Sequence, residues 1–407
     1  MLSRHLEGPL RAAVAESAAT LLIGPRQVGK STLVQGLVDQ GLFDRYFTLD
    51  DLTTLSSAKS DPQSFVAELP PRSVIDEVQR APELLLPIKA SVDRDRRPGR
   101  FLLTGSAAPE AIPQVSEALA GRVQMLTLWP FSQGELRQHQ ERFVDLLFST
   151  RGPHGVAEPL TRAELLSRVA RGGYPEAVTR KPGRRGAWFD AYVTTLLLRD
   201  VRDFARIDGT LELPNLLRFL ALRTAQPINL ADVSRDLGLP QTTTKRYAAL
   251  LHAAFLVRSI PPWFVNVTKR LVKTPKWVIS DSGLATHLCG LNELPPHHPL
   301  AGQLLETFVA CELLRQLSWH EGRINLHHFR THAGEEVDWV LERADGALVG
   351  VEVKLAAQVT HDDFKGLRAL RDLAPRRFQR GVILYSGETP VAFGKDLHAV
   401  PLGMLWS

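Results

Sequence analysis

The chain has 407 residues, 44% of them hydrophobic and 23% charged, a composition that excludes disordered and fibrous proteins and predicts roughly two to four folded domains. A formal net charge of +5 over this length favours acidic partners without specifying one. Two cysteines are too few for a disulfide framework, and no stretch reaches the ~20 apolar residues of a membrane span, so we expect a cytoplasmic protein that has no membrane segment.

The first predicted elements are a buried strand over AATLLI and an amphipathic helix over KSTLVQGLVDQ, joined by a loop that contains two glycines. The loop fits Gly-x4-Gly-Lys-Ser, in which backbone N–H groups and the helix amino terminus converge on phosphate oxygens. Lys30 would reach the outer phosphates and Ser31 would hold Mg2+; a glycine turn without a ligand is the alternative. We expect ATP to bind the loop formed by Gly24, Pro25, Arg26, Gln27, Val28, Gly29, Lys30, Ser31 and Thr32.

Two further strands end in polar residues suited to nucleotide hydrolysis. The stretch RSVIDEVQR, residues 72–80, ends a predicted strand with Asp76, which would face Mg2+ through water, and Glu77, which would polarise the attacking water. The stretch RFLLTGSA, residues 100–107, ends another with Thr104 and Ser106, whose hydroxyls would sense the terminal phosphate. The alternatives are a solvated acidic turn and polar strand caps without function.

Strands and helices alternate again through RYFTLDD and RVQMLTL, which predicts an α/β fold: a doubly wound sheet of about five parallel strands with helices on both faces. Ligands of such sheets bind at the carboxyl ends of the strands. The loop 24–31, Asp76 and Ser106 all fall at those ends, so we expect one nucleotide site there.

The middle of the chain turns helical after Phe131, with a Gly-Pro break at 152–153 and a Pro-Gly break at 182–183. The segment INLADVSRDLGLPQTTTKRYAALLHAAFLVRSIPP predicts a helix, a tight turn, a second helix and a strand, the order of a winged helix. Packing or protein contact is the alternative role, with the cations only solvating an edge hairpin. In the DNA-binding interpretation the second helix presents Thr242, Thr243, Lys245 and Arg246, and a basic wing presents Lys269, Arg270, Lys273 and Lys276 to phosphates.

The carboxy-terminal part predicts a helix with Glu306, a strand with Asp338 and a strand with Glu352 and Lys354. Strand alternation puts Glu352 and Lys354 on one face, so both can share a site with Asp338. Carboxylates that bind Mg2+ beside a lysine suit phosphodiester hydrolysis, and the pattern resembles the Asp…Glu-x-Lys core of restriction-endonuclease-like nucleases. Charge pairing across the sheet and a silent or binding-only site are the alternatives. The histidines fit no metal-ligand spacing and are interpreted as loop residues: 297, 298, 327, 328 and 332.

A family resemblance joins these segments. GPRQVGKST, VIDEVQ, LLTGSA and LAGRV resemble the ATPase module of a large prokaryotic family of AAA-type ATPases, over about the first 150 residues. GGYPEA, PPWFVNVTKRLVKTPKWVISDSGLATHL and EEVDWVLE look like the carboxy-terminal domain of uncharacterised function that accompanies it. The resemblance implies ATP and Mg2+ as cofactors, and it nominates Arg122 in LAGRV as an arginine that serves a neighbouring subunit of a homo-oligomer. A salt bridge at a strand start is the alternative for Arg122.

We therefore expect three domains: an ATPase domain over 1–150, a helical and winged-helix region over 151–290, and a nuclease-like α/β domain over 291–407. The predicted function is an ATP-driven switch or motor that acts on nucleic acid, DNA foremost. Two alternatives stay open. One is a signalling or scaffold ATPase with protein-binding later domains, and the other is an ATP-regulated nuclease.

Overall fold

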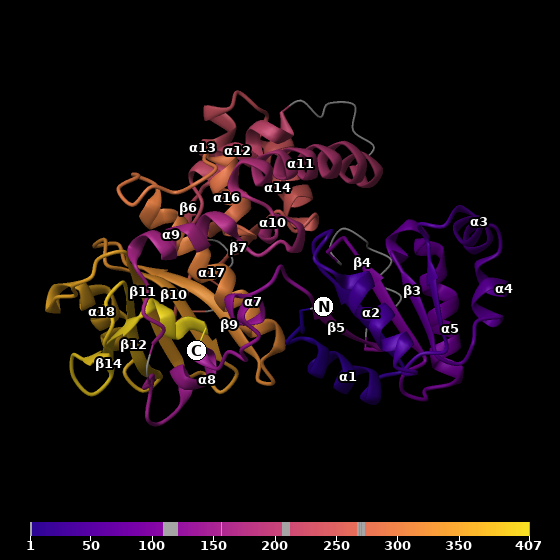
Figure 1. The fold of residues 1–407 in the computed structure, drawn as a ribbon, viewed down its shortest axis with the longest axis horizontal. Helices are drawn as coiled ribbons and strands as arrows, with labels where there is room; N and C mark the ends of the chain where they lie inside the picture. The colour runs from indigo at the N-terminus through magenta and orange to yellow at the C-terminus, as the bar shows by residue number, and fades with distance from the viewer. Residues whose placement is uncertain are drawn as a thin grey trace. The chain divides into compact units, whose positions relative to one another are not determined.

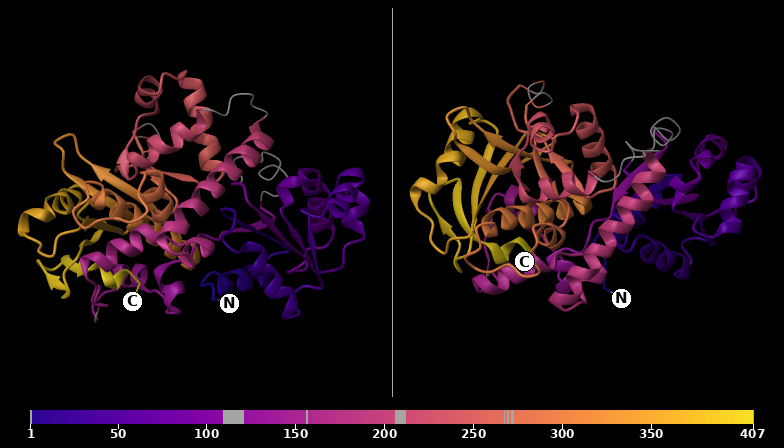
Figure 2. Two further views of the ribbon diagram at one scale, coloured as in Figure 1. Left: turned by 45° about the horizontal axis from the view of Figure 1, so that its top comes forward. Right: turned by 90° about the horizontal axis from the view of Figure 1, so that it is seen from above.

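The computed structural model describes residues 2–108, 121–155, 157–205, 212–266, 268, 270 and 273–406. It divides into two compact units, drawn in Figures 1 and 2. One unit is Met1–Pro130 with Leu250–Phe255, and the other is Phe131–Ala249 with Leu256–Ser407. Within the described residues, every helix is too short or too polar to span a bilayer. The domain boundaries expected near 150 and 290 stay predictions.

The first unit is a five-stranded parallel sheet in the order β2-β3-β4-β1-β5 with helices around it (Figure 1). Three of its strands are buried at every residue, as expected of a parallel sheet that is covered on both faces, and most of their residues are apolar. This confirms the predicted parallel α/β fold. The strands are β1 (Ala19–Ile23), β2 (Arg45–Thr48), β3 (Ser73–Asp76), β4 (Phe101–Gly105) and β5 (Val123–Thr127), and the helices are α1 (Glu7–Glu16), α2 (Lys30–Asp39), α3 (Leu52–Ser60), α4 (Pro62–Ala67) and α5 (Leu85–Arg94).

The register of this sheet aligns the carboxyl ends of its strands. Ile23 at the end of β1 lies beside Gly105 at the end of β4, and Thr48 at the end of β2 lies beside Asp76 at the end of β3. The loop that follows β1 therefore emerges at the same sheet edge as the polar residues that end β3 and β4.

The second unit contains helices, a three-stranded sheet in the order β6-β8-β7 and a six-stranded sheet in the order β13-β14-β12-β11-β10-β9. Its helices are α7 (Gln133–Arg137), α8 (Phe143–Phe148), α9 (Arg162–Arg171), α10 (Pro175–Val178), α11 (Pro182–Ala205), α12 (Leu213–Leu222), α13 (Leu230–Asp236), α14 (Gln241–Ala253), whose last residues group with the first unit, α16 (Ser282–Leu288), α17 (Ala301–Trp319) and α18 (Lys365–Leu373). Its strands are β6 (Gln226–Pro227), β7 (Val257–Ile260), β8 (Lys276–Ile279), β9 (Ile324–Arg330), β10 (Glu336–Arg343), β11 (Leu348–Lys354), β12 (Phe378–Tyr385), β13 (Val391–Ala392) and β14 (Leu397–Pro401).

A buried ion-pair network joins distant segments of the second unit. Asp281 is fully buried and caps α16 by accepting from the backbone N–H groups of Gly283 and Leu284 at 3.0 and 3.1 Å. Its other carboxylate oxygen accepts from the N–H of Gly173, in the GGYPEA segment, at 2.8 Å and from Arg315 of α17 at 2.9 Å. Arg315 also pairs with a second buried acid, Glu312. One guanidinium therefore faces two buried carboxyl groups.

Replacing Glu312 by glutamine should flatten the pH dependence of stability of the second unit. Burial raises the pKa of Glu312 from 4.5 to about 7, although Arg315 opposes the shift. Between pH 4.5 and pH 7 the unfolded chain has released this proton and the folded chain still holds it. The free energy of unfolding therefore falls as pH rises through this range, by about 3 kcal/mol in total. Urea unfolding at several pH values, followed by tryptophan fluorescence, measures the slope, because every tryptophan except Trp129 lies in this unit.

The exposed acid Glu321 provides the matched control, since Glu321→Gln should keep the wild-type slope. An equal slope in wild type and Glu312→Gln would show that Glu312 is ionised in the folded chain.

Candidate functional site

The loop between β1 and α2 has the geometry of a phosphate-binding turn. Gly24 has a φ of +150°, and a Cβ on it would lie 2.1 Å from the carbonyl oxygen of Leu128. Gly29 caps α2 with a left-handed backbone, φ +94°, and no side chain caps the helix. The first N–H groups of α2 thus point to the space where a phosphate would bind, and the positive end of the helix dipole favours an anion there.

Lys30 lies inside this loop. Its side chain is buried, and its ammonium donates to the carbonyl oxygens of Gly24 at 2.9 Å and Pro25 at 2.8 Å. Arg4 also fixes the loop, because its guanidinium donates to the carbonyl oxygens of Val28 at 2.7 Å and Trp129 at 2.5 Å. Sequence reasoning missed Arg4, since no motif marks an arginine that precedes the first strand.

Asp76 is the hydrogen-bond centre of the site. It is buried, and it accepts from the hydroxyls of Ser31 at 3.0 Å, Tyr46 at 2.6 Å and Thr104. Burial and this bond to Asp76 raise the pKa of Tyr46. A carboxylate beside a serine hydroxyl at the first turn of the helix is the donor set that Mg2+ takes beside nucleotide phosphates, so these residues fit the ion. Tyr46 was not predicted, because a tyrosine in a strand normally indicates core packing.

Glu77 follows Asp76 with a left-handed backbone, φ +61°, which costs free energy for a residue other than glycine and is typical of functional sites. Its N–H donates to the hydroxyl of Thr104 at 3.0 Å. Its carboxylate accepts from Ser106 at 2.9 Å and from Gln79, which also donates to Ser106 at 2.9 Å. The predicted base and the predicted phosphate sensor are therefore connected, through a glutamine that the sequence did not indicate.

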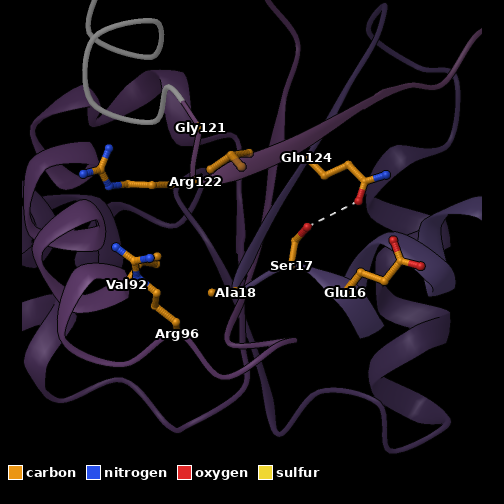
Figure 3. Close-up of a pocket in the computed structure, with 9 residues that line it drawn as sticks. Glu16, Ser17, Ala18, Val92, Arg96, Gly121, Arg122 and Gln124 are labelled. Atoms are coloured by element: carbon orange, nitrogen blue, oxygen red, sulfur yellow. Dashed lines mark hydrogen bonds between the residues drawn. The ribbon is translucent and has the colours of Figure 1, made fainter. Parts of the chain in front are cut away.

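Arg122 lies away from this site. It precedes β5, at the sheet edge opposite the carboxyl ends, and its Nε donates to Asp93 at 2.6 Å. The ion pair is the alternative that the sequence left open, and service to a neighbouring subunit stays a prediction. Figure 3 shows Arg122 with Arg96 lining a cavity of about 720 Å³, where Ser17 donates to Gln124 at 3.3 Å.

The candidate nucleic-acid contacts divide into an exposed and a buried set. On α14, Thr242, Lys245 and Arg246 are exposed and Thr243 is half-buried. In the segment between β7 and β8, Lys273 is exposed. Lys269 lies outside the described residues.

Arg270 requires a correction, because it is not a free phosphate contact. Its guanidinium pairs with Glu342 of β10 at 2.5 Å and donates to the carbonyl of Phe264 at 2.8 Å. The segment that carries it packs on the carboxy-terminal sheet, where the N–H of Trp263 donates to the carbonyl of His328 at 2.6 Å. The predicted wing is therefore paired with β9 along part of its length.

Lys276 requires the same correction. Its side chain is only 5% exposed, and its ammonium lies 3.2 Å from Asp338 and 3.9 Å from Glu306. It also lies 4.9 Å from the centre of the Trp339 ring. A lysine that was predicted to meet phosphates from the surface is instead buried among carboxylates.

The predicted carboxy-terminal site residues converge in part. Trp339 pairs with Val351 across antiparallel β10 and β11, so Asp338 and Glu352 occupy adjacent register positions, and the N–H of Asp338 donates to Glu352 at 3.4 Å. Burial raises the pKa of Glu306 and Glu352 well above the usual range, and the neighbouring Asp338 adds to both shifts. Burial also opposes ionisation of Asp338, but Lys276 and a hydrogen bond from Glu306 hold its pKa below its usual value.

Lys354 makes its ion pair outside this group of acids, yet it lies close enough to Glu352 to oppose the rise in the pKa of that acid. Its ammonium is partly exposed and pairs with Asp363, in a short 3-10 turn at His361–Phe364, at 3.0 Å.

Two of the five histidines expected in loops, His327 and His328, lie on β9 and are buried. Burial lowers the pKa of His328 to about 3. Among the described residues, no group of three or more His, Cys, Asp or Glu side chains is arranged to hold a metal ion.

Three family models match successive parts of the chain. Residues 16–137 match an AAA domain, residues 162–294 a domain of unknown function (DUF8612), and residues 301–405 a further domain of unknown function (DUF4143). The uncharacterized protein Rv2008c of Mycobacterium tuberculosis is 32% identical over 405 residues, which cover 98% of this chain and 83% of that protein. This chain belongs to the same family.

Two further similarities are more distant. An uncharacterized protein of Haemophilus influenzae is 23% identical over 357 residues, covering 81% of this chain and 80% of that protein. The Walker-type ATPase PABY2304 of Pyrococcus abyssi is a solved structure with 15% identity and a TM-score of 0.40, covering 71% of this chain and 96% of that one. The match over residues 16–137 assigns the parallel sheet and its glycine loop to an AAA domain and supports an ATPase function.

Gly24→Ala should destabilise the first unit by about 3 kcal/mol or more, because the added Cβ collides with a backbone oxygen at a φ that alanine rarely adopts. Gly36→Ala is the matched control, since a Cβ there meets no atom within 4 Å in the interior of α2, and it should raise stability by up to ~1 kcal/mol. Urea unfolding of both variants measures the difference. Equal stabilities would mean that the loop does not approach Leu128 this closely.

Proposed function

We propose that this chain is an ATP-driven switch or motor that acts on nucleic acid, DNA foremost, and uses Mg2+ for hydrolysis. The ATPase half rests on one observation: Lys30, Ser31, Asp76, Glu77 and Ser106 gather at the carboxyl edge of one parallel sheet. The nucleic-acid half rests on the order and exposure of elements in the second unit.

The ATPase proposal assigns a task to each residue. Lys30 leaves its loop carbonyls to contact the outer phosphates, and the first amides of α2 bind phosphate oxygens. Ser31 and Asp76 would hold Mg2+, which when bound neutralises charge on the phosphates. Glu77 orients and deprotonates the attacking water, and Ser106 places the Glu77 carboxylate.

The nucleic-acid proposal is supported by the order α12, β6, α13, α14, β7, β8, in which β7 and β8 form an antiparallel hairpin. This is the order of a winged helix, with α14 as the helix that would enter the groove. The exposed Thr242, Lys245 and Arg246 support this role. Since Arg270 and Lys276 pair with acids inside the chain, Lys273 is the cation of the described wing that stays available for phosphate.

We also propose a nuclease-like carboxy-terminal domain, because Asp338 and Glu352 meet across adjacent strands.

A signalling or scaffold ATPase is the second candidate, and one observation favours it. The segment 261–264 pairs with β9 instead of extending as a free wing, as expected of a winged helix used for packing. The two candidates differ in whether DNA binds and whether it stimulates hydrolysis.

Homo-oligomerisation belongs to the proposal too, because Arg122 lies at the sheet edge away from its own nucleotide loop and would serve a second copy.

Glu77→Gln should keep nucleotide binding and lower turnover by roughly 10²- to 10⁴-fold, because it removes the base and leaves the phosphate loop intact. Lys30→Ala should instead weaken ATP binding by roughly 10- to 100-fold through the loss of a charged hydrogen bond. Phosphate release and fluorescent-nucleotide binding measure the two effects. Glu83→Gln, an exposed acid nearby in the chain, is the control. Full turnover in Glu77→Gln would assign the base elsewhere.

Charge reversal of Lys245 and Arg246 should weaken DNA binding at low salt by at least ~10-fold and reduce the slope of log affinity against log salt by about 2, since two phosphate contacts disappear. Fluorescence anisotropy with duplex and single-stranded DNA measures both quantities. Reversal of Arg162 and Arg376, exposed cations on other segments, should leave binding near wild type. Wild-type chain that binds no DNA at low salt would favour the signalling candidate.

A further inference from the structure

The cation that meets the carboxylates of the nuclease-like domain comes from outside that domain. Asp338, Glu306 and Glu352 belong to β10, α17 and β11, and their side chains gather around one place. The ammonium of Lys276, on β8, donates to Asp338 at 3.2 Å. The lysine of the Glu-x-Lys pattern, Lys354, pairs with Asp363 instead.

The ammonium of Lys276 is buried and makes several specific contacts. Its side chain is 5% exposed, so its ammonium has lost its hydration and depends on Asp338, Glu306 and the face of the Trp339 ring. Asp338 in turn is 3% exposed at its side chain, and its second oxygen accepts from the N–H of Val353 at 2.9 Å. The charge of each side chain therefore offsets the free-energy cost of removing the other from water.

The same carboxylates are those that the nuclease interpretation would give to a divalent ion. A divalent ion and a buried ammonium compete for the same carboxylate oxygens, because either cation can balance their charge. An ammonium at hydrogen-bond distance of Asp338 supplies the balancing charge.

We propose that Lys276 is the resident cation of the nuclease-like site: its ammonium takes the position of a divalent metal ion, so the domain holds its carboxylates without metal and does not cleave phosphodiesters. This inference rests on the nuclease-like assignment proposed above. It also gives the hairpin a role, because the residue that closes the site is the first residue of β8. The carboxy-terminal domain then acts by binding, and the lysine ties it to the three-stranded sheet.

Mn2+ binding to the full-length chain, measured without nucleotide by electron paramagnetic resonance, tests the proposal. Wild type should bind no more Mn2+ than Asp338→Asn. Lys276→Met, which keeps the length and removes the charge, should gain a Mn2+ site that Lys276→Met combined with Asp338→Asn lacks. Lys273→Met, the exposed lysine of the same hairpin, and Lys276→Arg should gain none.

Two results would overturn the proposal. One is a Mn2+ site, or Mg2+-dependent cleavage of DNA, in wild type that Asp338→Asn abolishes, and this comparison holds even if Lys276→Met does not fold. The other is folded Lys276→Met without a new Mn2+ site, which would make Lys276 an ordinary buried ion pair. Neither Mn2+ binding nor DNA cleavage at this site depends on Lys245 or Arg246. Absence of DNA binding would therefore contradict the winged-helix proposal, whereas the Mn2+ measurement alone tests the role of Lys276.

Discussion

The second unit depends on the burial of one carboxylate. Asp281 caps α16, receives the N–H of Gly173 and pairs with Arg315, so three segments far apart in the chain are fixed by one side chain. Gly173 tolerates no side chain, since a Cβ would lie 2.1 Å from the carbonyl of Phe131. Each oxygen of this buried side chain accepts hydrogen bonds from two donors, which offsets the cost of removing it from water. The short motifs GGYPEA and SDSG are thus the two halves of a single contact.

The nucleotide loop and the strand ends were predictable because each obeys a local rule. A glycine loop between strand and helix needs only neighbouring residues to be recognised, and parallel register then brings Asp76 and Thr104 together. Tyr46, Gln79 and Arg4 were not predictable in this way. Each makes a hydrogen bond to a residue 24 to 125 positions away, and no local motif marks these three residues.

The basic wing shows the limit of reading charge from one sequence. An acid-free run with several cations indicates a phosphate-binding surface only if the cations reach solvent. Arg270 and Lys276 find acids 72 and 62 residues later, and burial decides their role. The convergence of Asp338 with Glu352 was predictable from strand alternation, but the partner cation was not, because strand periodicity says nothing about which other element packs there.

Lys30 has a consequence for how the ATPase domain distinguishes nucleotides. In the folded chain its ammonium already has two good acceptors, the carbonyls of Gly24 and Pro25. A ligand draws it away only by offering oxygens of greater negative charge, as the outer phosphates do. A nucleotide without a terminal phosphate offers less, so the loop keeps more of its own hydrogen bonds. Recognition at this loop is therefore a competition between the backbone and the ligand for one cation, and the charge of the phosphate chain decides it.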